Sequence, residues 1–280
     1  MQTFKTAKSI LELSEKLRQE GQTIGFVPTM GALHEGHISL IKKAREANDI
    51  VVCSVFVNPS QFNESADFEN YPRTLESDIK QLKSADCDFV FAPPTDEVFP
   101  EKDTAEYELG EVARELEGAH RPGHFNGVAS VVKRLLELVN PHRAYFGLKD
   151  YQQYAVIKAL VKRYKMDVDI VGCEIVRERS GLAMSSRNIR LSNGGRDTAL
   201  ALYRSLREAQ SALRAGKTVA QAESAGRVIL KMVPVDLEYF EIRNRSDLSQ
   251  PAEKTDNLIA LVAARVEGIR LIDNLFLNME

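Results

Sequence analysis

Hydrophobic and polar positions follow two alternating patterns along the first two thirds of the chain. Short, nearly continuous apolar runs have the length and residue types of strands that are buried on both faces. These runs lie at 24–27, 49–57, 87–92, 144–146 and 168–176. Between them, apolar residues recur every three or four positions, as at Leu75, Ile79 and Leu82, which predicts amphipathic helices. This alternation predicts an α/β fold with a Rossmann-like doubly wound parallel sheet.

The pattern changes after Arg177. Two helical segments are expected, and Thr218 with Gln221 has the spacing of a capping box at the start of the second. Three alternating segments, 235–242, 258–266 and 269–272, then predict strands. We therefore predict two domains, a Rossmann-like domain over residues 1–176 and a smaller C-terminal α+β domain over 177–280, with a loop at the junction serving as hinge and lid. The segment 95–114 is expected to be irregular.

Composition narrows the possible partners and surroundings. The 280 residues include 44% hydrophobic residues, enough for a full core, and carry a formal net charge of −3. A partner that is a nucleic acid or a membrane surface would require a basic excess, so neither is expected. No apolar run approaches membrane-spanning length, and the start MQTFKTAKSI has no long apolar segment. Three widely spaced cysteines indicate reduced, buried thiols and predict a cytoplasmic location.

The stretch FVPTMGALHEGHISL, residues 26–40, reads as strand, glycine-bearing loop and helix. A helix N-terminus presents backbone N–H groups and a partial positive charge, which suits a phosphate. His34 and His37 are three residues apart there, which places both imidazoles on one side of the first turn. Hydrogen-bond donors at a phosphate stabilise the charge that develops during transfer at a nucleotide α-phosphate.

Other interpretations of the histidine pair are weaker. Two isolated histidines are often plain surface residues, but the glycine between them and the strand–loop–helix setting favour a functional role. A zinc site is disfavoured because no third ligand follows at suitable spacing. The H-x-G-H pattern resembles the signature of the nucleotidylyltransferase superfamily, whose members join AMP or CMP to a phosphate or carboxylate and release pyrophosphate.

Further polar groups lie at the ends of other predicted elements. Asn58 and Gln61 follow a buried strand, at the edge of a sheet where ligands bind, although an ordinary polar loop is equally compatible with their spacing. Lys149 supplies a compact cation and Arg187 a rigid donor fork, two ways of holding phosphates. Lys149 alone would be interpreted as a solvated lysine at a helix start, but beside the histidine loop a nucleotide contact is favoured. The run M-S-S-R resembles the K-M-S-K-S type loop of class I aminoacyl-tRNA synthetases, which belong to the same superfamily.

Six motifs in this order and spacing resemble one family of that superfamily, the pantothenate synthetases or pantoate–β-alanine ligases. They are PTMGALHEGH, VFVNPSQF, YPRTLESD, RPGHFNGV, FGLKDYQQ and GLAMSSRN. The likeness covers residues 20–192, and the last hundred residues carry little that is diagnostic. It implies a Rossmann-like ATP- and pantoate-binding domain, a lid domain and a cytoplasmic homodimer. It also implies that ATP and Mg²⁺ serve to adenylate pantoate, and that β-alanine then attacks to give pantothenate, AMP and pyrophosphate on the route to coenzyme A.

The resemblance also implies roles for individual residues. The catalytic residue would be His37, and pantoate would contact Gln61 and Gln153, with Gln61 also bordering β-alanine. ATP contacts would be Met30, Gly31, Ala32, Leu33, His34, Glu35, Gly36, His37, Gly147, Leu148, Lys149, Asp150, the backbone of Val176, Met184, Ser185, Ser186 and Arg187. Asn58 matches a polar position near the same pocket.

The chain departs from the family pattern at two positions. Leu148 stands where glutamate is common, so that side chain cannot be a strict requirement. Ser77 precedes Asp78 where two aspartates are common, which leaves the metal ligands open. Two other functions stay possible at this point, a nucleotidylyltransferase without an amine-dependent step and a nucleotide sensor without catalysis. Keeping both histidines together with Lys149 and Arg187 favours an enzyme over a sensor, since a sensor needs no stabilisation of a transition state.

Overall fold

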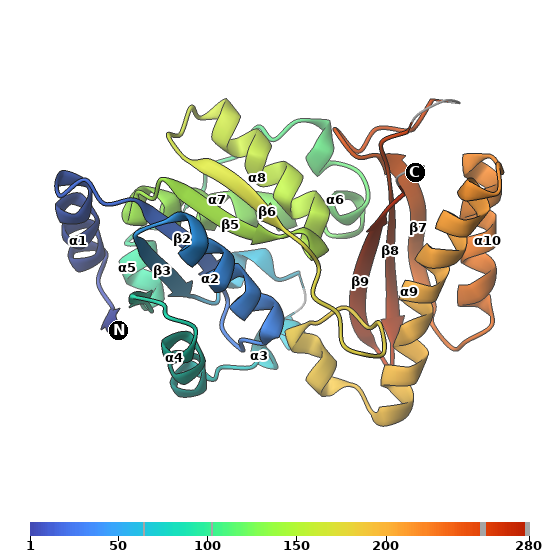
Figure 1. Ribbon diagram of the computed structural model, residues 1–280, viewed down its shortest axis with the longest axis horizontal. Helices are drawn as coiled ribbons and strands as arrows, with labels where there is room; N and C mark the ends of the chain where they lie inside the picture. The colour runs from blue at the N-terminus through green and yellow to red at the C-terminus, as the bar shows by residue number, and fades with distance from the viewer. Residues whose placement is uncertain (64, 102, 253–255, 278–280) are drawn as a thin grey trace. The chain divides into compact units, whose positions relative to one another are not determined.

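The protein is described by a computed structural model that covers residues 1–63, 65–101, 103–252 and 256–277. The chain forms two compact units (Figure 1). The first unit comprises Met1–Leu148 and Gln153–Glu174. The second comprises the short segment Lys149–Gln152 and the chain from Ile175 onward. Each unit has its own sheet and its own core, and each is described separately below.

A six-stranded sheet forms the centre of the first unit, with strand order β1-β4-β3-β2-β5-β6 and parallel pairing at every neighbour. The strands are β1 (Gln2–Phe4), β2 (Ile24–Thr29), β3 (Ile50–Val55), β4 (Phe89–Phe91), β5 (Arg143–Gly147) and β6 (Asp169–Cys173). From β2 the chain adds β3 and β4 on one side, and it then adds β5 and β6 on the other side of β2. The predicted doubly wound parallel sheet is therefore confirmed. Strand β1, only three residues long, was not predicted.

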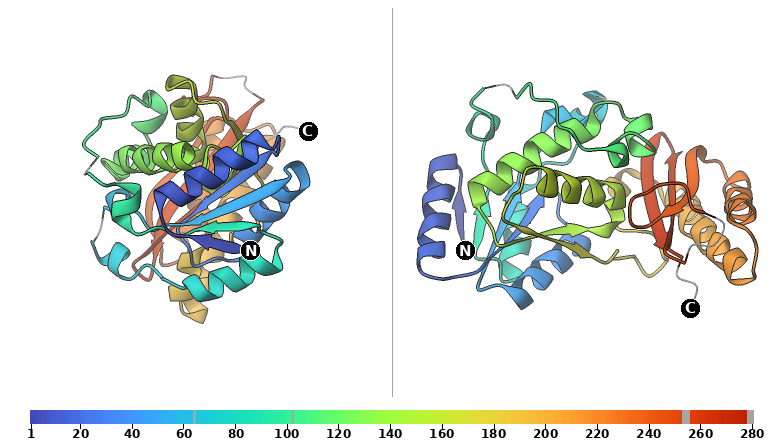
Figure 2. Two further views of the ribbon diagram at one scale, coloured as in Figure 1. Left: turned by 90° about the vertical axis from the view of Figure 1, so that its left-hand side faces the viewer. Right: turned by 90° about the horizontal axis from the view of Figure 1, so that it is seen from above.

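Helices cover both faces of this sheet (Figures 1 and 2). The helices in this part of the chain are α1 (Ala7–Gln19), α2 (Glu35–Ala47), α3 (Ser65–Glu69), α4 (Leu75–Ser84), α5 (Thr95–Val98), α6 (Glu117–His120), α7 (His124–Val139) and α8 (Tyr151–Arg163). Neighbouring residues of β2 belong to different cores, because side chains alternate between the faces of a strand. Phe26 packs in the core that α1, α7 and α8 contribute to, whereas Val27 packs in the core of α2 and α4. The segment 95–114 was predicted to be irregular, and among its residues 95–101 and 103–114 the helical parts are α5 and a single turn of 3₁₀ helix, Glu111–Ala113.

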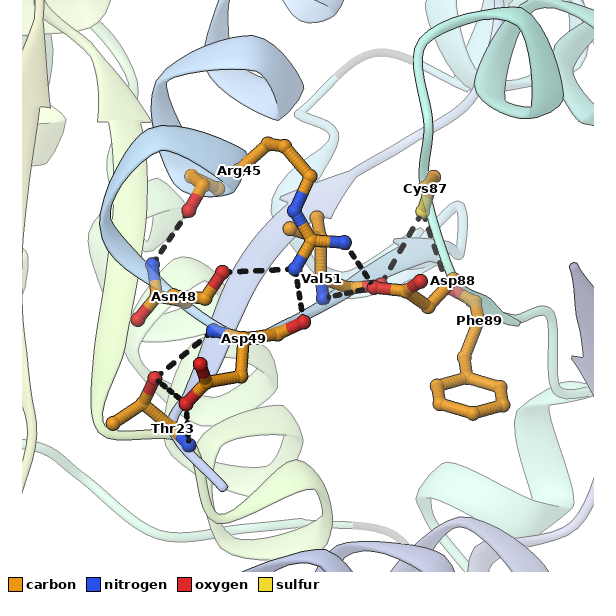
Figure 3. Close-up of polar contacts among 9 residues, drawn as sticks. Thr23, Arg45, Asn48, Asp49, Val51, Cys87, Asp88 and Phe89 are labelled. Atoms are coloured by element: carbon orange, nitrogen blue, oxygen red, sulfur yellow. Dashed lines mark hydrogen bonds and ion pairs between the residues drawn. The ribbon is translucent and has the colours of Figure 1, made fainter.

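Polar side chains tie together the amino ends of three neighbouring strands of the first unit (Figure 3). The Asp88 carboxylate, just before β4, accepts hydrogen bonds from Arg45 Nη1 at 2.6 Å and from the Val51 N–H at 2.7 Å. The Asp49 carboxylate, just before β3, accepts from the Thr23 N–H at 2.9 Å and from Thr23 Oγ1 at 2.7 Å. These contacts fix the amino edge of the sheet, and the loops at the opposite, carboxyl edge are available for function.

The second unit contains an antiparallel sheet of order β7-β8-β9. Its strands are β7 (Asp236–Asn244), β8 (Leu258–Val266) and β9 (Ile269–Phe276), and its helices are α9 (Asn193–Arg214) and α10 (Val219–Lys231). Leu202 and Leu206 of α9 pack with Phe240 and Val262 of the sheet in one buried core. The predicted capping box is confirmed, since the Thr218 N–H donates to Gln221 Oε1 at 2.9 Å and the Gln221 N–H donates to Thr218 Oγ1 at 3.3 Å. The predicted smaller α+β part is thus confirmed as well.

Two further features concern the helices and the cysteines of the chain. None of the helices in the described ranges combines the length and the apolar character that crossing a membrane requires. The three cysteines, Cys53, Cys87 and Cys173, are free and buried. Burial raises the pKa of the Cys87 thiol to about 12 and that of the Cys173 thiol to about 11. These thiols therefore stay protonated at neutral pH, which makes them poor nucleophiles.

Candidate functional site

The histidine pair forms the N-terminal cap of α2. His34 Nδ1 accepts a hydrogen bond from the Gly36 N–H at 3.1 Å, and His37 Nδ1 accepts one from the His34 N–H at 3.3 Å. The two ring centroids lie 4.1 Å apart. A neutral imidazole that accepts at Nδ1 carries its proton on Nε2. This reciprocal cap therefore fixes the tautomer of both rings and makes each Nε2 a hydrogen-bond donor.

The backbone of the preceding loop is largely bonded within the protein. The Gly31 N–H donates to Thr29 Oγ1 at 3.2 Å. The Ala32 and Leu33 N–H groups donate to the two oxygens of Asp78, at 3.1 Å and 2.9 Å. These three N–H groups precede the helix, which begins at Glu35, and their bonds fix the course of the loop that leads to the histidines.

Asp78, on α4, is fully buried and holds this loop. Besides the two backbone N–H groups, it accepts a hydrogen bond from Thr74 Oγ1 at 3.2 Å. Gly31 approaches it closely, with φ of +79° and space such that an added β-carbon would lie 3.0 Å from Asp78 Oδ2. Glycine is needed at position 31 both for this backbone conformation and for the close approach. In the sequence, Asp78 was noted only near a possible metal-binding region. Its partner Leu33 is 45 residues away, and no local pattern indicates that contact.

The amide of Asn58 makes structural contacts within the first unit. Asn58 is 2% exposed, and its Nδ2 donates to the Gly127 carbonyl at 3.1 Å. Its Oδ1 accepts from the Ser60 N–H at 3.3 Å and caps the 3₁₀ turn Pro59–Gln61. Gly127 permits this packing, since a β-carbon there would lie 2.4 Å from the Ser60 carbonyl oxygen. Asn58 therefore shapes the turn that carries Gln61.

Gln61 is held from the start of α7. Its carbonyl oxygen accepts hydrogen bonds from His124 Nδ1 at 2.8 Å and from Arg121 Nη2 at 3.2 Å. Its side-chain amide lies against the Met30 sulfur, so Gln61 is next to the start of the histidine loop. The helix α7 begins at His124, within the R-P-G-H-F-N-G-V motif. Arg121 and His124 of this motif support Gln61, whereas Asn126 bonds to Tyr107 and Ala105.

The candidate residues of the first unit gather at one edge of its sheet. The histidine loop follows β2, the Gln61 turn follows β3, and Gly147 ends β5. These three strands are neighbours in the order β3-β2-β5 and are parallel, so their carboxyl ends share one edge. Leu148 is buried and packs so near β6 that a β-carbon on Gly172 would lie 2.7 Å from Leu148 Cδ2. The Leu148 side chain is therefore part of the packing between β5 and β6. Gln153 lies half-buried on the first turn of α8.

The remaining candidates belong to the second unit: Lys149, Asp150, Val176, Met184, Ser185, Ser186 and Arg187. Lys149 Nζ lies 3.7 Å from Asp150 Oδ2. The Met184 N–H donates to the Val176 carbonyl at 3.0 Å and closes a hairpin. Ser185 Oγ accepts from the Arg187 N–H at 3.3 Å and begins the 3₁₀ helix Ser186–Arg190. Main-chain geometry thus presents the M-S-S-R run on a defined turn.

Buried polar residues support that turn from behind. Asn188 is 4% exposed, and its Nδ2 donates to the Ala183 carbonyl at 3.0 Å and to Glu178 Oε1 at 3.2 Å. Glu178 also pairs with Arg196 of α9, whose Nη2 lies 2.7 Å and 2.6 Å from its two carboxylate oxygens. The last residue of the G-L-A-M-S-S-R-N motif is therefore a buried anchor for the residues before it.

Sequence reasoning missed two polar residues of β9. Asp273 forms a two-pronged ion pair with Arg177, with Nη1–Oδ2 at 2.6 Å and Nη2–Oδ1 at 2.9 Å. Burial raises the pKa of the Asp273 carboxyl, and the bonds from Arg177 oppose that rise. Asn274 Nδ2 donates to the Lys149 carbonyl at 2.8 Å. The available signal was an adjacent Asp-Asn pair in a strand whose other residues, apart from Arg270, are apolar.

Comparison with known proteins relates this arrangement to one family. The family model of pantoate–β-alanine ligases matches residues 2–276. The pantothenate synthetase of Cytophaga hutchinsonii is 46% identical over 269 residues, which cover 95% of each chain. That of Thermotoga petrophila is 44% identical over 281 residues, with 99% of this chain and 100% of the relative covered.

Solved structures agree with this over the whole length. A pantothenate synthetase from Thermus thermophilus superposes with a TM-score of 0.93 at 43% identity, covering 99% of this chain and 100% of that one. A pantoate–β-alanine ligase from Francisella tularensis, solved as a complex with β-γ ATP and β-alanine, gives a TM-score of 0.82 at 37% identity. In that comparison 99% of this chain and 97% of the other are covered.

Proposed function

This chain belongs to the pantoate–β-alanine ligase family, and on that premise we propose how its own residues perform the reaction. It is a ligase that uses ATP to form the amide bond between pantoate and β-alanine, a step of pantothenate biosynthesis. We propose that the reaction passes through an enzyme-bound pantoyl adenylate. The observation that carries the assignment of residues is the reciprocal cap of His34 and His37, which orients two N–H donors at the carboxyl edge of the sheet.

In the first half-reaction, a pantoate carboxylate oxygen attacks the α-phosphorus of ATP, and the bond to pyrophosphate breaks. Negative charge develops on the phosphoryl oxygens as the phosphorus becomes crowded. We assign His37 as the catalytic residue, because its Nε2–H is aimed by the backbone and can donate to that charge without reorganising. His34 would donate to the same nucleotide. Because the cap fixes both rings before ATP binds, little orientational entropy is lost when the reaction occurs.

The family resemblance implies further ATP contacts, which we propose for this chain. They are Met30, Gly31, Ala32, Leu33, Glu35, Gly36, Gly147, Leu148, Lys149, Asp150, the Val176 backbone, Met184, Ser185, Ser186 and Arg187. Lys149 as a point charge and Arg187 as a donor fork would neutralise the departing pyrophosphate. Residues 1–176 would then act as the ATP- and pantoate-binding domain and 177–280 as the lid.

Pantoate would be oriented by Gln61 and Gln153, whose amides can both donate to and accept from its hydroxyl and carboxylate groups. The bonds that His124 and Arg121 make to the Gln61 carbonyl support this role, because they fix the backbone of Gln61. Gln61 would also border β-alanine. In the second half-reaction the amine attacks the carbonyl carbon of the adenylate and AMP leaves, so the site must exclude water until then.

We propose that Mg²⁺ accompanies the ATP rather than residing in the protein. In the part of the chain that the structure describes, no three His, Cys, Asp or Glu side chains gather as a metal site. Both oxygens of Asp78 are bonded to backbone N–H groups. Mg²⁺ typically keeps several waters and binds through substrate phosphates with one or two carboxylates. Bound in that way, it would neutralise charge on the triphosphate.

A cytoplasmic location and a homodimer complete the proposal. The buried, free cysteines support a reducing compartment, since none of the three is placed in a disulfide. The homodimer is expected from the family resemblance, and light scattering on the purified protein tests it through the molar mass. A mass of one chain, with full activity, would contradict the dimer.

Isotope exchange tests the proposed function. The protein should exchange labelled pyrophosphate into ATP when pantoate is present and β-alanine is absent, because exchange needs a reversible adenylate held by the enzyme. Adding β-alanine should drain the intermediate and release AMP. Exchange that strictly requires β-alanine would argue for a concerted reaction of three substrates. Exchange supported only by a phosphorylated acceptor would indicate a different nucleotidylyltransferase, and ATP binding without any pyrophosphate release would indicate a sensor.

A further inference from the structure

The segment that carries Lys149 is attached to the C-terminal sheet. In sequence, Lys149–Gln152 lies between β5 and most of α8, which belong to the first unit, yet its contacts place it in the second. Asn274 Nδ2 donates to the Lys149 carbonyl at 2.8 Å. The Tyr151 hydroxyl donates to the Arg245 carbonyl at 2.5 Å, and the rings of Tyr151 and Phe276 meet edge to face at 5.6 Å between centroids. Three separate contacts therefore fasten Lys149 and Tyr151 to β9 and to Arg245, the residue that follows β7.

Asn274 and its neighbour Asp273 also hold the base of the M-S-S-R turn. Arg177, at the start of that hairpin, pairs with the Asp273 carboxylate and donates from Nη2 to the Asn274 carbonyl at 3.1 Å. Its guanidinium lies 4.0 Å from the centroid of the Tyr203 ring. Asp273 is 4% exposed and Asn274 is 2% exposed, so both polar side chains are committed to these partners. The Asp273–Asn274 pair thus contacts both the segment that carries Lys149 and the hairpin that leads to Arg187.

We propose that Asp273 and Asn274 are positioning residues that set Lys149 and the Arg187 turn as one rigid cradle for the ATP phosphates. This inference rests on the proposed function of Lys149 and Arg187. A lysine side chain is flexible, and its point charge is only as well placed as its backbone. The Asn274 amide fixes that backbone through the Lys149 carbonyl, while Asp273 fixes the hairpin through Arg177. Neither β9 residue touches ATP in this proposal.

The first test replaces Asn274 by leucine, which keeps the size and removes the donor. Displacing a catalytic group by about 1 Å can cost roughly 10²-fold in rate, so Asn274→Leu should lower kcat for pantoate-dependent pyrophosphate exchange by about 10- to 100-fold. The KM for pantoate should change little, because Gln61 and Gln153 belong to the first unit. Hydrogen exchange should show faster exchange at the amides of 149–152.

Gln210→Leu is the matched control. Gln210 is 8% exposed, and its Nε2 donates to the Phe276 carbonyl at 3.0 Å, so it too gives β9 a buried amide-to-carbonyl bond. It does not bond to the segment 149–152. This variant should lose a similar amount of thermal stability while keeping kcat near the wild-type value and leaving amide exchange at 149–152 unchanged. If Asn274→Leu fails to fold, Tyr151→Phe removes only the hydroxyl attachment and should give the same changes on a smaller scale.

A double variant separates positioning from general weakening. If Asn274 acts through Lys149, then Asn274→Leu should lower kcat no further in a Lys149→Ala background. The proposal would be overturned if the losses of kcat from the two substitutions multiplied in the double variant. It would also be overturned if a folded Asn274→Leu variant kept the wild-type kcat, or if its amide exchange at 149–152 were unchanged. If the wild-type protein showed no pyrophosphate exchange with pantoate, the proposed function would fail, and with it the catalytic part of this inference. Amide exchange would still decide whether Asn274 holds the segment.

Discussion

Replacing Asp78 by asparagine tests whether the histidine loop is held by a buried carboxylate. The change keeps the shape of the side chain but replaces one acceptor oxygen with an NH₂ group. If the remaining oxygen keeps its bonds to Leu33 and Thr74, the new NH₂ faces the Ala32 N–H, which donated to Asp78 Oδ2 at 3.1 Å. Two donors then face each other in a site with no exposure to water.

The size of the effect follows from these contacts. A hydrogen bond to a charged group contributes about 1.5–3 kcal/mol, and a buried donor left without an acceptor costs about 1–3 kcal/mol. We therefore expect Asp78→Asn to lower the free energy of unfolding of the first unit by about 2–4 kcal/mol. The loop should also move relative to α2, and a displacement near 1 Å would lower the exchange rate roughly 10²-fold.

Urea unfolding and pyrophosphate exchange measure the two effects, and Asp49→Asn is the control. The Asp49 carboxylate also accepts two hydrogen bonds, both from Thr23, but it lies at the amino edge of the same sheet (Figure 3). Asp49→Asn should leave exchange turnover near the wild-type value. Our reasoning would be refuted if Asp78→Asn behaved like Asp49→Asn in both assays, or lost stability without losing turnover.

Three further predictions concern single residues. His37→Ala should fold and lose about 10²–10³-fold in kcat, as expected when one donor to a developing oxyanion is removed, and near-normal turnover would exclude His37 from the mechanism. Lys149→Ala should reduce kcat strongly and Lys149→Arg should not restore it fully, whereas Leu148→Ala should mainly affect packing; a larger loss of kcat from the Leu148 change would place the phosphate contact elsewhere. The hydrogen bonds from Thr23 lower the pKa of Asp49, so the stability that they contribute is complete above the unfolded pKa, about 3.9, and is lost as pH falls through the folded value. Wild type should therefore exceed Thr23→Val in stability at neutral pH, and urea titrations should show that difference shrinking in acid, whereas a constant difference would contradict the assignment.

Periodicity was enough to predict the fold class, because β3 and β8 are long, apolar and bounded by turns. Periodicity failed where contacts between residues distant in sequence determine the local structure. Strand β1 has three residues, too few for a pattern, and gains its partner only in β4. The start of α7 at His124 has little local signal, because His124 and Asn126 are polar and Gly127 disfavours a helix. In the structure these residues pack against or bond with segments distant in sequence, which outweighs their weak local preference.

The candidate site shows the same division. Motif spacing singled out the histidines, Gln61 and Lys149, since short loops at strand ends are local in sequence. The supporting contacts span long separations, as between Leu33 and Asp78 or between Lys149 and Asn274. Such pairs depend on which strands become neighbours, and a single sequence does not state that order. The motifs therefore pointed to the groups that we propose as substrate contacts, but not to the groups that hold them.

The buried thiols make this protein a convenient subject for distance spectroscopy. Cys53, Cys87 and Cys173 are all enclosed and hold their protons, so a maleimide or methanethiosulfonate reagent should react slowly with the native chain. Cysteines introduced at the exposed positions Lys42 and Lys231, one in each unit, would then be labelled without removing any native thiol. A spin-label pair at these sites could follow the separation of the two units as each substrate is added, on a chain whose core is untouched.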